Sequence, residues 1–139
     1  MTYILDTNVI SELRKRANGH PNVVRWSARV APQTLYTSVL VIGEIRRGIA
    51  LKGRSDPAQA AALDQWLVRV RAGMAGRILA VDDRVADIWG RLGVPDPIPA
   101  IDGLLAATAL THDFILVSRN LNDLRRTGAR VLDPFSYEA

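Results

Sequence analysis

The chain has 139 residues, 48% of them hydrophobic and none of them cysteine, with 18 Lys and Arg against 14 Asp and Glu. This composition predicts one globular domain over residues 1–139 and excludes a disordered chain, a disulfide framework and a zinc–thiolate site. The basic balance favours anionic partners such as nucleic acid, and the short apolar runs without a basic leader predict a cytoplasmic protein with no membrane partner.

The first half of the chain predicts two strands and three helices. Strands are predicted at Tyr3–Asp6 and Thr34–Thr37, and helices at Val9–Arg16, Val23–Val30 and Val39–Leu51. Ser38 precedes the third helix and is predicted to cap it. Gly53 and the Ser55-Asp56-Pro57 group then break the helical pattern.

The second half continues the alternation. Helices are predicted at Ala58–Ala72, after Asp82 as a cap, and at Ala100–His112, and strands at Ile78–Val81, Phe114–Ser118 and Arg130–Leu132. Prolines make Gly93–Pro99 a rigid loop. Short apolar strands separated by helices predict the α/β class, with a central, mainly parallel sheet of four to five strands flanked by helices.

Three acids stand on apolar elements. Asp6 ends the first strand, at the edge where α/β sheets collect function, although it is also a good helix cap. Glu44 shares its helix face with Leu40 and Val41, so we expect it to face a polar cleft or a cation, or else to pair with an arginine such as Arg47. Asp102 lies in a first helical turn, whose face continues through Leu105, Ala106 and Ala109, and first-turn capping is its alternative.

A fourth polar group follows the fourth strand. Ser118 and Asn120 lie at its end, with Asp123 shortly after. If the first and fourth strands are neighbours, Asp6 and Asn120 meet at one rim. Such a set of oxygen-bearing side chains predicts a site for a hard divalent cation, Mg²⁺ or Mn²⁺.

Other candidate sites are weaker. His20 and His112 lack zinc-ligand spacing and are expected at the surface or in loops. Asp82 and Asp83 are better explained as helix caps than as ligands. No stretch matches a phosphate-binding loop or a dinucleotide fingerprint, so a nucleotide cofactor has no support.

The acids and their surroundings together resemble a known family. The segments that carry the resemblance are LDTNVISEL with Asp6, Glu44 in a helix after a strand, AIDGLLAATAL with Asp102, and ILVSRN before a short last strand. In this order, along essentially the whole chain, they resemble the PIN domain, more closely the VapC or FitB type of toxin from bacterial toxin–antitoxin pairs. The resemblance implies a PIN-like three-layer sandwich and a Mg²⁺-dependent endoribonuclease that cuts structured RNA such as tRNA or rRNA.

The resemblance also assigns residues. Asp6, Glu44 and Asp102 take the three principal acidic positions, as catalytic residues and metal ligands. The fourth position, often aspartate in the family, is Asn120 here, with Asp123 close enough in sequence to compensate. We therefore expect one well-held ion plus a second recruited by substrate. Thr7, Asn8 and Ser118 match polar positions that hold the acids in place.

The implied partners are an RNA substrate and a VapB-like antitoxin that neutralises the toxin and enters the groove between the early helices. A homodimer, a toxin–antitoxin hetero-oligomer and operator DNA contacted only through the antitoxin are implied as well. The predicted RNA contacts, which could equally form a solvated basic surface, are Arg46, Arg47, Arg119, Arg125 and Arg126. Trp26, Trp66 and Trp89 could serve interfaces or the core.

Two rival interpretations remain. The haloacid-dehalogenase-like phosphohydrolases need a second Asp two residues after the first, and that position is Asn8 here, which breaks their motif. A PIN-shaped binding module without catalysis, acting through its partner, is the other alternative, and Asn120 is its only sequence support.

Overall fold

A fully parallel five-stranded sheet forms the centre of the molecule. The computed structural model describes residues 1–138, so that Ala139, the last residue of the expected domain, lies outside the described residues. The strands are β1 (Tyr3–Leu5), β2 (Leu35–Ser38), β3 (Ile78–Leu79), β4 (Ile115–Val117) and β5 (Val131–Leu132). Their spatial order is β3-β2-β1-β4-β5, and every neighbouring pair is parallel. The predicted α/β class is confirmed.

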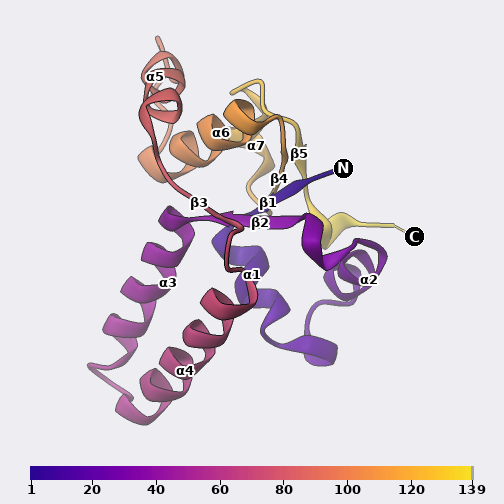
Figure 1. Cartoon of the computed structure of the whole chain (residues 1–139), viewed down its shortest axis with the longest axis vertical. Helices are drawn as coiled ribbons and strands as arrows, with labels where there is room; N and C mark the ends of the chain where they lie inside the picture. Colours follow the sequence, from indigo (N-terminus) through magenta and orange to yellow (C-terminus); the bar gives the residue numbers. More distant parts are fainter. Residues whose placement is uncertain (139) are drawn as a thin grey trace.

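Helices cover both faces of this sheet. They are α1 (Thr7–Leu13), α2 (Pro21–Arg29), α3 (Val39–Lys52), α4 (Pro57–Gly73), α5 (Asp83–Arg91), α6 (Ala100–His112) and α7 (Leu121–Arg125), with short 3₁₀ turns at Arg16–Asn18, Pro32–Thr34 and Pro134–Ser136. In Figure 1, α1, α3 and α4 lie on one side of the sheet, and α5, α6 and α7 lie on the other. Three layers result. None of the helices in residues 1–138 combines the length and hydropathy needed to cross a membrane.

Polar side chains start several helices where the sequence predicts them. The Ser38 hydroxyl accepts a hydrogen bond from the Leu40 N–H at 3.1 Å, and the Asp82 carboxylate accepts one from the Val85 N–H at 3.0 Å. Both bonds satisfy N–H groups that have no partner within the helix. The first helix starts earlier than predicted because the Asp6 carboxylate caps it, which also ends β1 at Leu5. Helix α7 is missing from the prediction.

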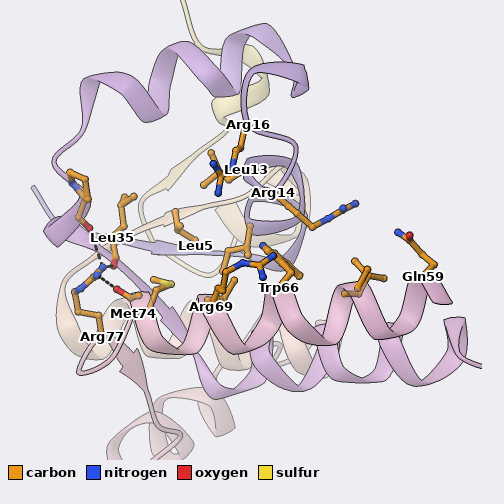
Figure 2. Close-up of a pocket in the computed structure, with 16 residues that line it drawn as sticks. Leu5, Leu13, Arg14, Arg16, Leu35, Gln59, Trp66, Arg69, Met74 and Arg77 are labelled. Carbon is orange, nitrogen blue, oxygen red and sulfur yellow. Dashed lines mark hydrogen bonds between the residues drawn. The ribbon is translucent and has the colours of Figure 1, made fainter. Parts of the chain in front are cut away.

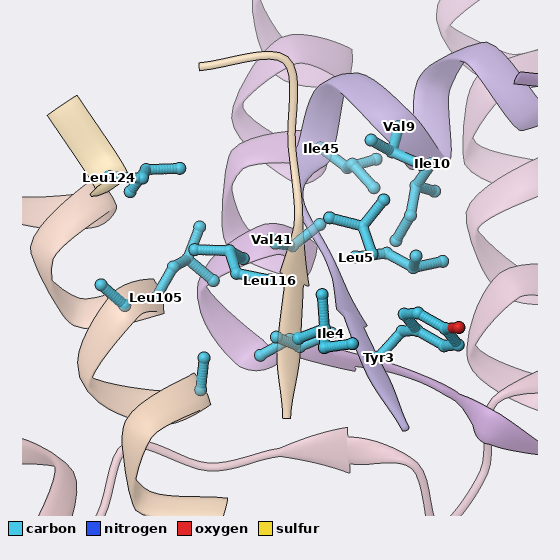
Figure 3. Close-up of a cluster of buried hydrophobic side chains, with 14 of the residues drawn as sticks. Tyr3, Ile4, Leu5, Val9, Ile10, Val41, Ile45, Leu105, Leu116 and Leu124 are labelled. Atoms are coloured by element: carbon cyan, nitrogen blue, oxygen red, sulfur yellow. The ribbon is translucent and has the colours of Figure 1, made fainter. Parts of the chain in front are cut away.

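The core lies on both faces of the central strands. Figure 3 shows Ile4 of β1 and Leu116 of β4 between two groups of helical side chains. Val9, Ile10, Val41 and Ile45 pack from α1 and α3, whereas Leu105 and Leu124 pack from α6 and α7. The small Ala106 and Ala109 are buried as well, as expected for a helix that packs closely. Trp26 is 2% exposed and belongs to this core rather than to an interface.

The strand order places β1 at a topological switch point. The chain runs from β1 outward through β2 to β3, and then returns to place β4 on the opposite side of β1. In open α/β sheets, ligands bind beyond the carboxyl ends of the strands at such a point. Asp6 lies there, and its backbone N–H donates to the Val117 carbonyl at 2.9 Å. The end of β1 and the end of β4 therefore share one rim, as predicted.

Candidate active site

Asp6 is a buried carboxylate held by neutral donors. It is only 5% exposed, and its two oxygens accept hydrogen bonds from the Thr7 N–H and the Ser118 hydroxyl, each at 2.7 Å. The capping role and the rim position thus belong to the same side chain. In residues 1–138, the acids in ion pairs are Glu12, Asp64, Asp87 and Asp113. No cation neutralises Asp6 among the described residues.

Asp102 faces Asn120 across the rim. One carboxylate oxygen of Asp102 accepts a hydrogen bond from the Asn120 side-chain amide at 2.8 Å. The N-cap position of α6 is Pro99, so the carboxylate of Asp102 does not serve as the cap. Burial raises the pKa of Asp102, and the negative charges of Asp6, Asp123 and Glu44 raise it further, against the lowering effect of the Asn120 hydrogen bond. The predicted acids therefore lie close enough to act on one another.

Glu44 differs from its prediction. The buried face of α3 consists of Val41, Ile42, Ile45 and Ile49, and Glu44 lies on the exposed side with Gly48 and Leu51. The expected apolar surroundings of Glu44 were therefore wrong, and its charge carries no burial penalty. Glu44 does not pair with Arg47 in the described residues; instead its carboxylate accepts a hydrogen bond from the Thr7 hydroxyl. Thr7 thus ties Glu44 of α3 to the start of α1, next to Asp6.

A chain of hydrogen bonds connects the acids. The Ser118 hydroxyl donates to Asp6 and accepts the backbone N–H of Asn120 at 3.1 Å, while the side chain of Asn120 donates to Asp102. The Asn8 side chain accepts the backbone N–H of Arg119 at 3.3 Å. The three polar residues expected to hold the acids, Thr7, Asn8 and Ser118, all lie in this network. Asn120 acts as a donor to Asp102, a role that an ionised aspartate at this position could not fill.

The donor set fits a divalent metal ion in its chemistry. Along the described part of the chain, no three Asp, Glu or His side chains are already gathered to hold one ion. Each acid points at its own neutral donor instead, Asp6 at Ser118, Asp102 at Asn120 and Glu44 at Thr7. Carboxylates without a cationic partner, at mutual distances where their charges interact, are the ligands that Mg²⁺ and Mn²⁺ prefer.

The predicted RNA-contacting arginines differ in how they are held. Arg46 is paired with Asp64 of α4 at 2.8 Å, so its charge is compensated and it does not stand free at the rim. Arg126 donates to the carbonyls of Asp96 and Pro97 and so fixes the proline-rich loop ahead of α6. Arg119 lies over the ring of Phe135. Arg47 and Arg125 are exposed on α3 and α7.

His20 and His112 make structural contacts, and each packs against an aromatic ring. The Nδ1 atom of His20 accepts the Asn22 N–H at 3.2 Å and so caps α2, and its ring meets Phe135 edge-on. The ring of His112 lies 5.4 Å from that of Phe114. Both histidines are half-buried rather than exposed. No periodicity in the sequence could have identified Phe135 as a contact of His20, because the two residues are far apart in the chain.

An apolar groove lies beside the rim. Figure 2 shows this groove between α1, α4 and β2, with a volume of about 640 Å³. Its apolar lining includes Leu5, Ile10, Leu13, Leu35, Leu63, Trp66, Val70 and Met74, and its arginines are Arg14, Arg16, Arg69 and Arg77. No Asp or Glu is among its lining residues. Because Leu5 immediately precedes Asp6, the groove reaches the strand end that carries the first acid.

Comparison with known proteins shows the family of the chain. Residues 3–129 match the family model of the PIN domain. The chain is 32% identical to toxin FitB of Neisseria gonorrhoeae over 140 residues, which cover 95% of this chain and 97% of FitB. It is 30% identical to the VapC ribonuclease Y4jK of Sinorhizobium fredii over 137 residues, covering 95% and 96% of the two chains. The solved structure of FitAB bound to an IR36 DNA fragment superposes with a TM-score of 0.87 at 29% identity, over 99% of both chains.

Proposed function

Since the chain belongs to the PIN domain family, as a member of its FitB and VapC type, we propose that it is a metal-dependent endoribonuclease and the toxin of a type II toxin–antitoxin pair. The observation that carries the proposal is the chain of hydrogen bonds at one rim that links Glu44, Asp6 and Asp102 through Thr7, Ser118 and Asn120. The names toxin and ribonuclease of the relatives support it.

The chemistry of the site follows from its carboxylates. Asp6, Glu44 and Asp102 would hold Mg²⁺ or Mn²⁺, with Asp123 as a further acid nearby. A bound ion supplies activation of water and of the scissile phosphate. The residues of the chain orient the ligands: Ser118 holds Asp6, Asn120 holds Asp102, and Thr7 holds Glu44. With Asn120 in place of a fourth aspartate, the site suits one resident ion, and a second would arrive with the substrate.

The proposed substrate is structured RNA, of the tRNA or rRNA class. Its phosphates would meet a chain with a formal net charge of +4 and exposed arginines on the elements that surround the acids. Most of the affinity for RNA would then come from backbone phosphates and fall as salt rises. The specific target would depend on RNA shape and on unpaired bases.

The groove between α1 and α4 is the proposed site of the antitoxin. An apolar floor with arginines and no acids suits a partner segment that carries apolar side chains and carboxylates. Arg77 donates to the carbonyls of Pro32, Leu35 and Gly73, so it shapes the wall, whereas Arg14 stacks over Trp66 with its charge unpaired in the described residues. A homodimer, and operator DNA bound only through the antitoxin, complete the proposal.

Purified protein and total bacterial RNA test the enzymatic part. We expect cleavage with Mg²⁺, none with a chelator, and a loss of at least about 100-fold in Asp6→Asn and Asp102→Asn. Asparagine keeps the size of each side chain and one acceptor oxygen, which suffices for the Asp6 cap of α1 and for the bond that Asp102 accepts from Asn120, so both variants should fold. The matched control is Asp87→Asn, which removes an exposed acid far along α5 and should cut RNA normally.

Two outcomes would contradict the proposal. If Asp102→Asn cleaved RNA normally, the acids at the rim would not be the catalytic centre. A wild-type protein that cuts no RNA with any divalent ion, yet still binds its antitoxin, would favour the binding-module alternative.

A further inference from the structure

We propose that Arg119, stacked on Phe135, is the residue that grips an RNA phosphate next to the acid site. The inference rests on the proposed function and deepens it. The sequence predicts several arginines as RNA contacts, and the structure singles out Arg119 among them as the phosphate contact next to the acids.

The backbone of Arg119 is fixed between the supports of two acids. Ser118, on one side, donates to Asp6, and Asn120, on the other, donates to Asp102. The N–H of Arg119 itself donates to the Asn8 side chain. Any RNA strand that reaches Asp6 and Asp102 must therefore pass close to the start of the Arg119 side chain.

The side chain of Arg119 rests on a rigid aromatic surface. Its guanidinium carbon lies 3.7 Å from the ring centre of Phe135, which is only 9% exposed. The Phe135 ring meets His20 edge-on with centres 5.4 Å apart, and the Phe135 carbonyl accepts a hydrogen bond from the Asn22 side chain at 2.6 Å. Both neighbours belong to the start of α2, so the ring cannot swing away without disturbing that helix. The position of the guanidinium is thereby restricted before any ligand binds.

Stacking leaves the hydrogen-bonding capacity of this arginine available. A guanidinium donates in its own plane, so an aromatic ring beneath it stabilises the cation without using its N–H groups. Arg119 is exposed, and in residues 1–138 it forms no ion pair. A planar, pre-oriented and unpaired guanidinium suits the two oxygens of a phosphate.

The neighbouring arginines differ on each of these points. Arg46 is paired with Asp64, and Arg126 is bonded to loop carbonyls. Arg125 is exposed, with no recorded hydrogen bond, ion pair or aromatic contact of its side chain in the described residues, so it would lose more side-chain entropy on binding a phosphate. Carboxylates at the rim repel RNA, and a fixed cation beside them offsets that repulsion.

Salt-dependent RNA binding tests the inference. All variants are made in the Asp6→Asn background so that the RNA stays intact, and a fluorescein-labelled single-stranded RNA of mixed sequence is titrated by anisotropy over a series of KCl concentrations. We expect Arg119→Gln to weaken binding about 10-fold and to reduce the slope of log K against log salt by about 0.7–1. Arg119→Lys should keep the slope and lose affinity, because it keeps the charge but not the stacked fork.

Two controls separate contact from structure. Arg125→Gln removes an exposed arginine on the next helix and should change affinity less than Arg119→Gln. Phe135→Leu removes the aromatic surface while the charge remains, so it should weaken binding with an unchanged salt slope. The inference is overturned if Arg119→Gln binds RNA with the same salt slope as the parent protein, or if it loses no more RNA affinity than Arg125→Gln. It is also overturned if Arg119→Gln affects only the binding of the antitoxin.

Failure of the inference and failure of the proposed function give different results. If wild type cuts RNA with Mg²⁺ but Arg119→Gln keeps parental RNA binding, only the role of Arg119 is wrong. If wild type neither cuts nor binds RNA, both are wrong.

Discussion

The rim at the ends of β1 and β4 and the groove between α1 and α4 have opposite chemistry. The rim gathers Asp6, Asp102 and Glu44, which have no cationic partner among the described residues. The groove combines arginines with an apolar floor and has no acidic lining residue. They meet where Leu5 of the groove is followed by Asp6 of the rim. On the proposed function, the rim would bind a cation and the groove would bind an acidic, apolar segment of the antitoxin.

The largest effect that separates the two regions is expected from Ser118→Ala. The change leaves Asp6 with one donor fewer and the Asn120 N–H without its acceptor. We expect metal affinity and RNA cleavage to fall about 10–100-fold, as for other residues that orient metal ligands, with antitoxin binding unchanged. Calorimetric titration with Mn²⁺ measures the metal affinity, and a cleavage assay measures the activity on RNA.

Removal of a buried hydroxyl can also lower the stability of the whole protein, whether or not the hydroxyl lies near the metal-binding acids. The matched control is Thr108→Val, because Thr108 is buried and its hydroxyl bonds only to the Leu104 carbonyl of its own helix. If this control lost as much metal affinity as Ser118→Ala, the role of Ser118 in holding Asp6 would have to be abandoned.

A change in the groove should give the converse result. Trp66 lies in the groove under Arg14, and removing a large aromatic side chain from an interface commonly costs 10-fold or more in affinity. We expect Trp66→Ala to weaken binding of the cognate antitoxin by at least about 10-fold. RNA cleavage should persist. Trp89→Ala, which changes an exposed tryptophan outside the groove, is the control; equal losses in both variants would argue against the groove as the binding site.

The charge of the groove should matter less than its shape. Arg69 lines the groove and is exposed, so Arg69→Gln should slow association with the antitoxin by a few-fold, roughly 2–5-fold, mainly at low salt. Stopped-flow measurements at two KCl concentrations give the rate. An association rate that stays the same at low salt would show that the arginines do not steer this partner.

The smallest expected effect is a gain in stability at the rim. The raised pKa of Asp102 means that the folded state binds its proton more tightly than the unfolded state, whose pKa is near the ordinary value of 3.8. The stability that Asp102 gains from binding its proton more tightly in the folded state is fully present below pH 3.8. It is lost as the pH rises through the pKa of Asp102 in the folded state. Without divalent ions, Asp102→Asn should therefore be slightly more stable than wild type at neutral pH, and the gain is small because the group is partly exposed and screened.

Urea denaturation as a function of pH measures this difference. The gain should shrink as pH falls toward 3.8 and should reverse when Mg²⁺ is added, since only wild type would bind it. A variant less stable than wild type at neutral pH without metal would mean that neither burial nor the neighbouring acids penalise the charge of Asp102.

Local sequence patterns predict much of the fold. Helix α6 has the residues expected for it, Ala100–His112, and Ser38 and Asp82 cap the helices that they precede. These features depend on neighbours in the chain, which the sequence contains directly. The meeting of Asp6 with Ser118 and Asn120 could also be predicted, because the ends of adjacent parallel strands share an edge.

Features that depend on distant packing could not be predicted in this way. Helix α3 has apolar residues around much of its first turns, so only the position of the sheet decides that Val41 and Ile45 are buried while Glu44 is exposed. Helix α7 is too short to show a helical period. The stacking of Arg119 on Phe135 and the groove of Figure 2 bring together residues that no local pattern of the sequence connects.

The parallel pairing of β1 with β4 has a consequence for synthesis. Tyr3 pairs with Ile115, and Asp6 depends on Ser118 for one of its hydrogen bonds, so more than 100 residues of chain must be synthesised between the two parts of the rim. A chain still held by the ribosome before β4 emerges has its first acid but not the strand and donors that complete the rim. On the proposed function, the chain therefore gains its RNA-cleaving centre only after β4 has been made and has paired with β1.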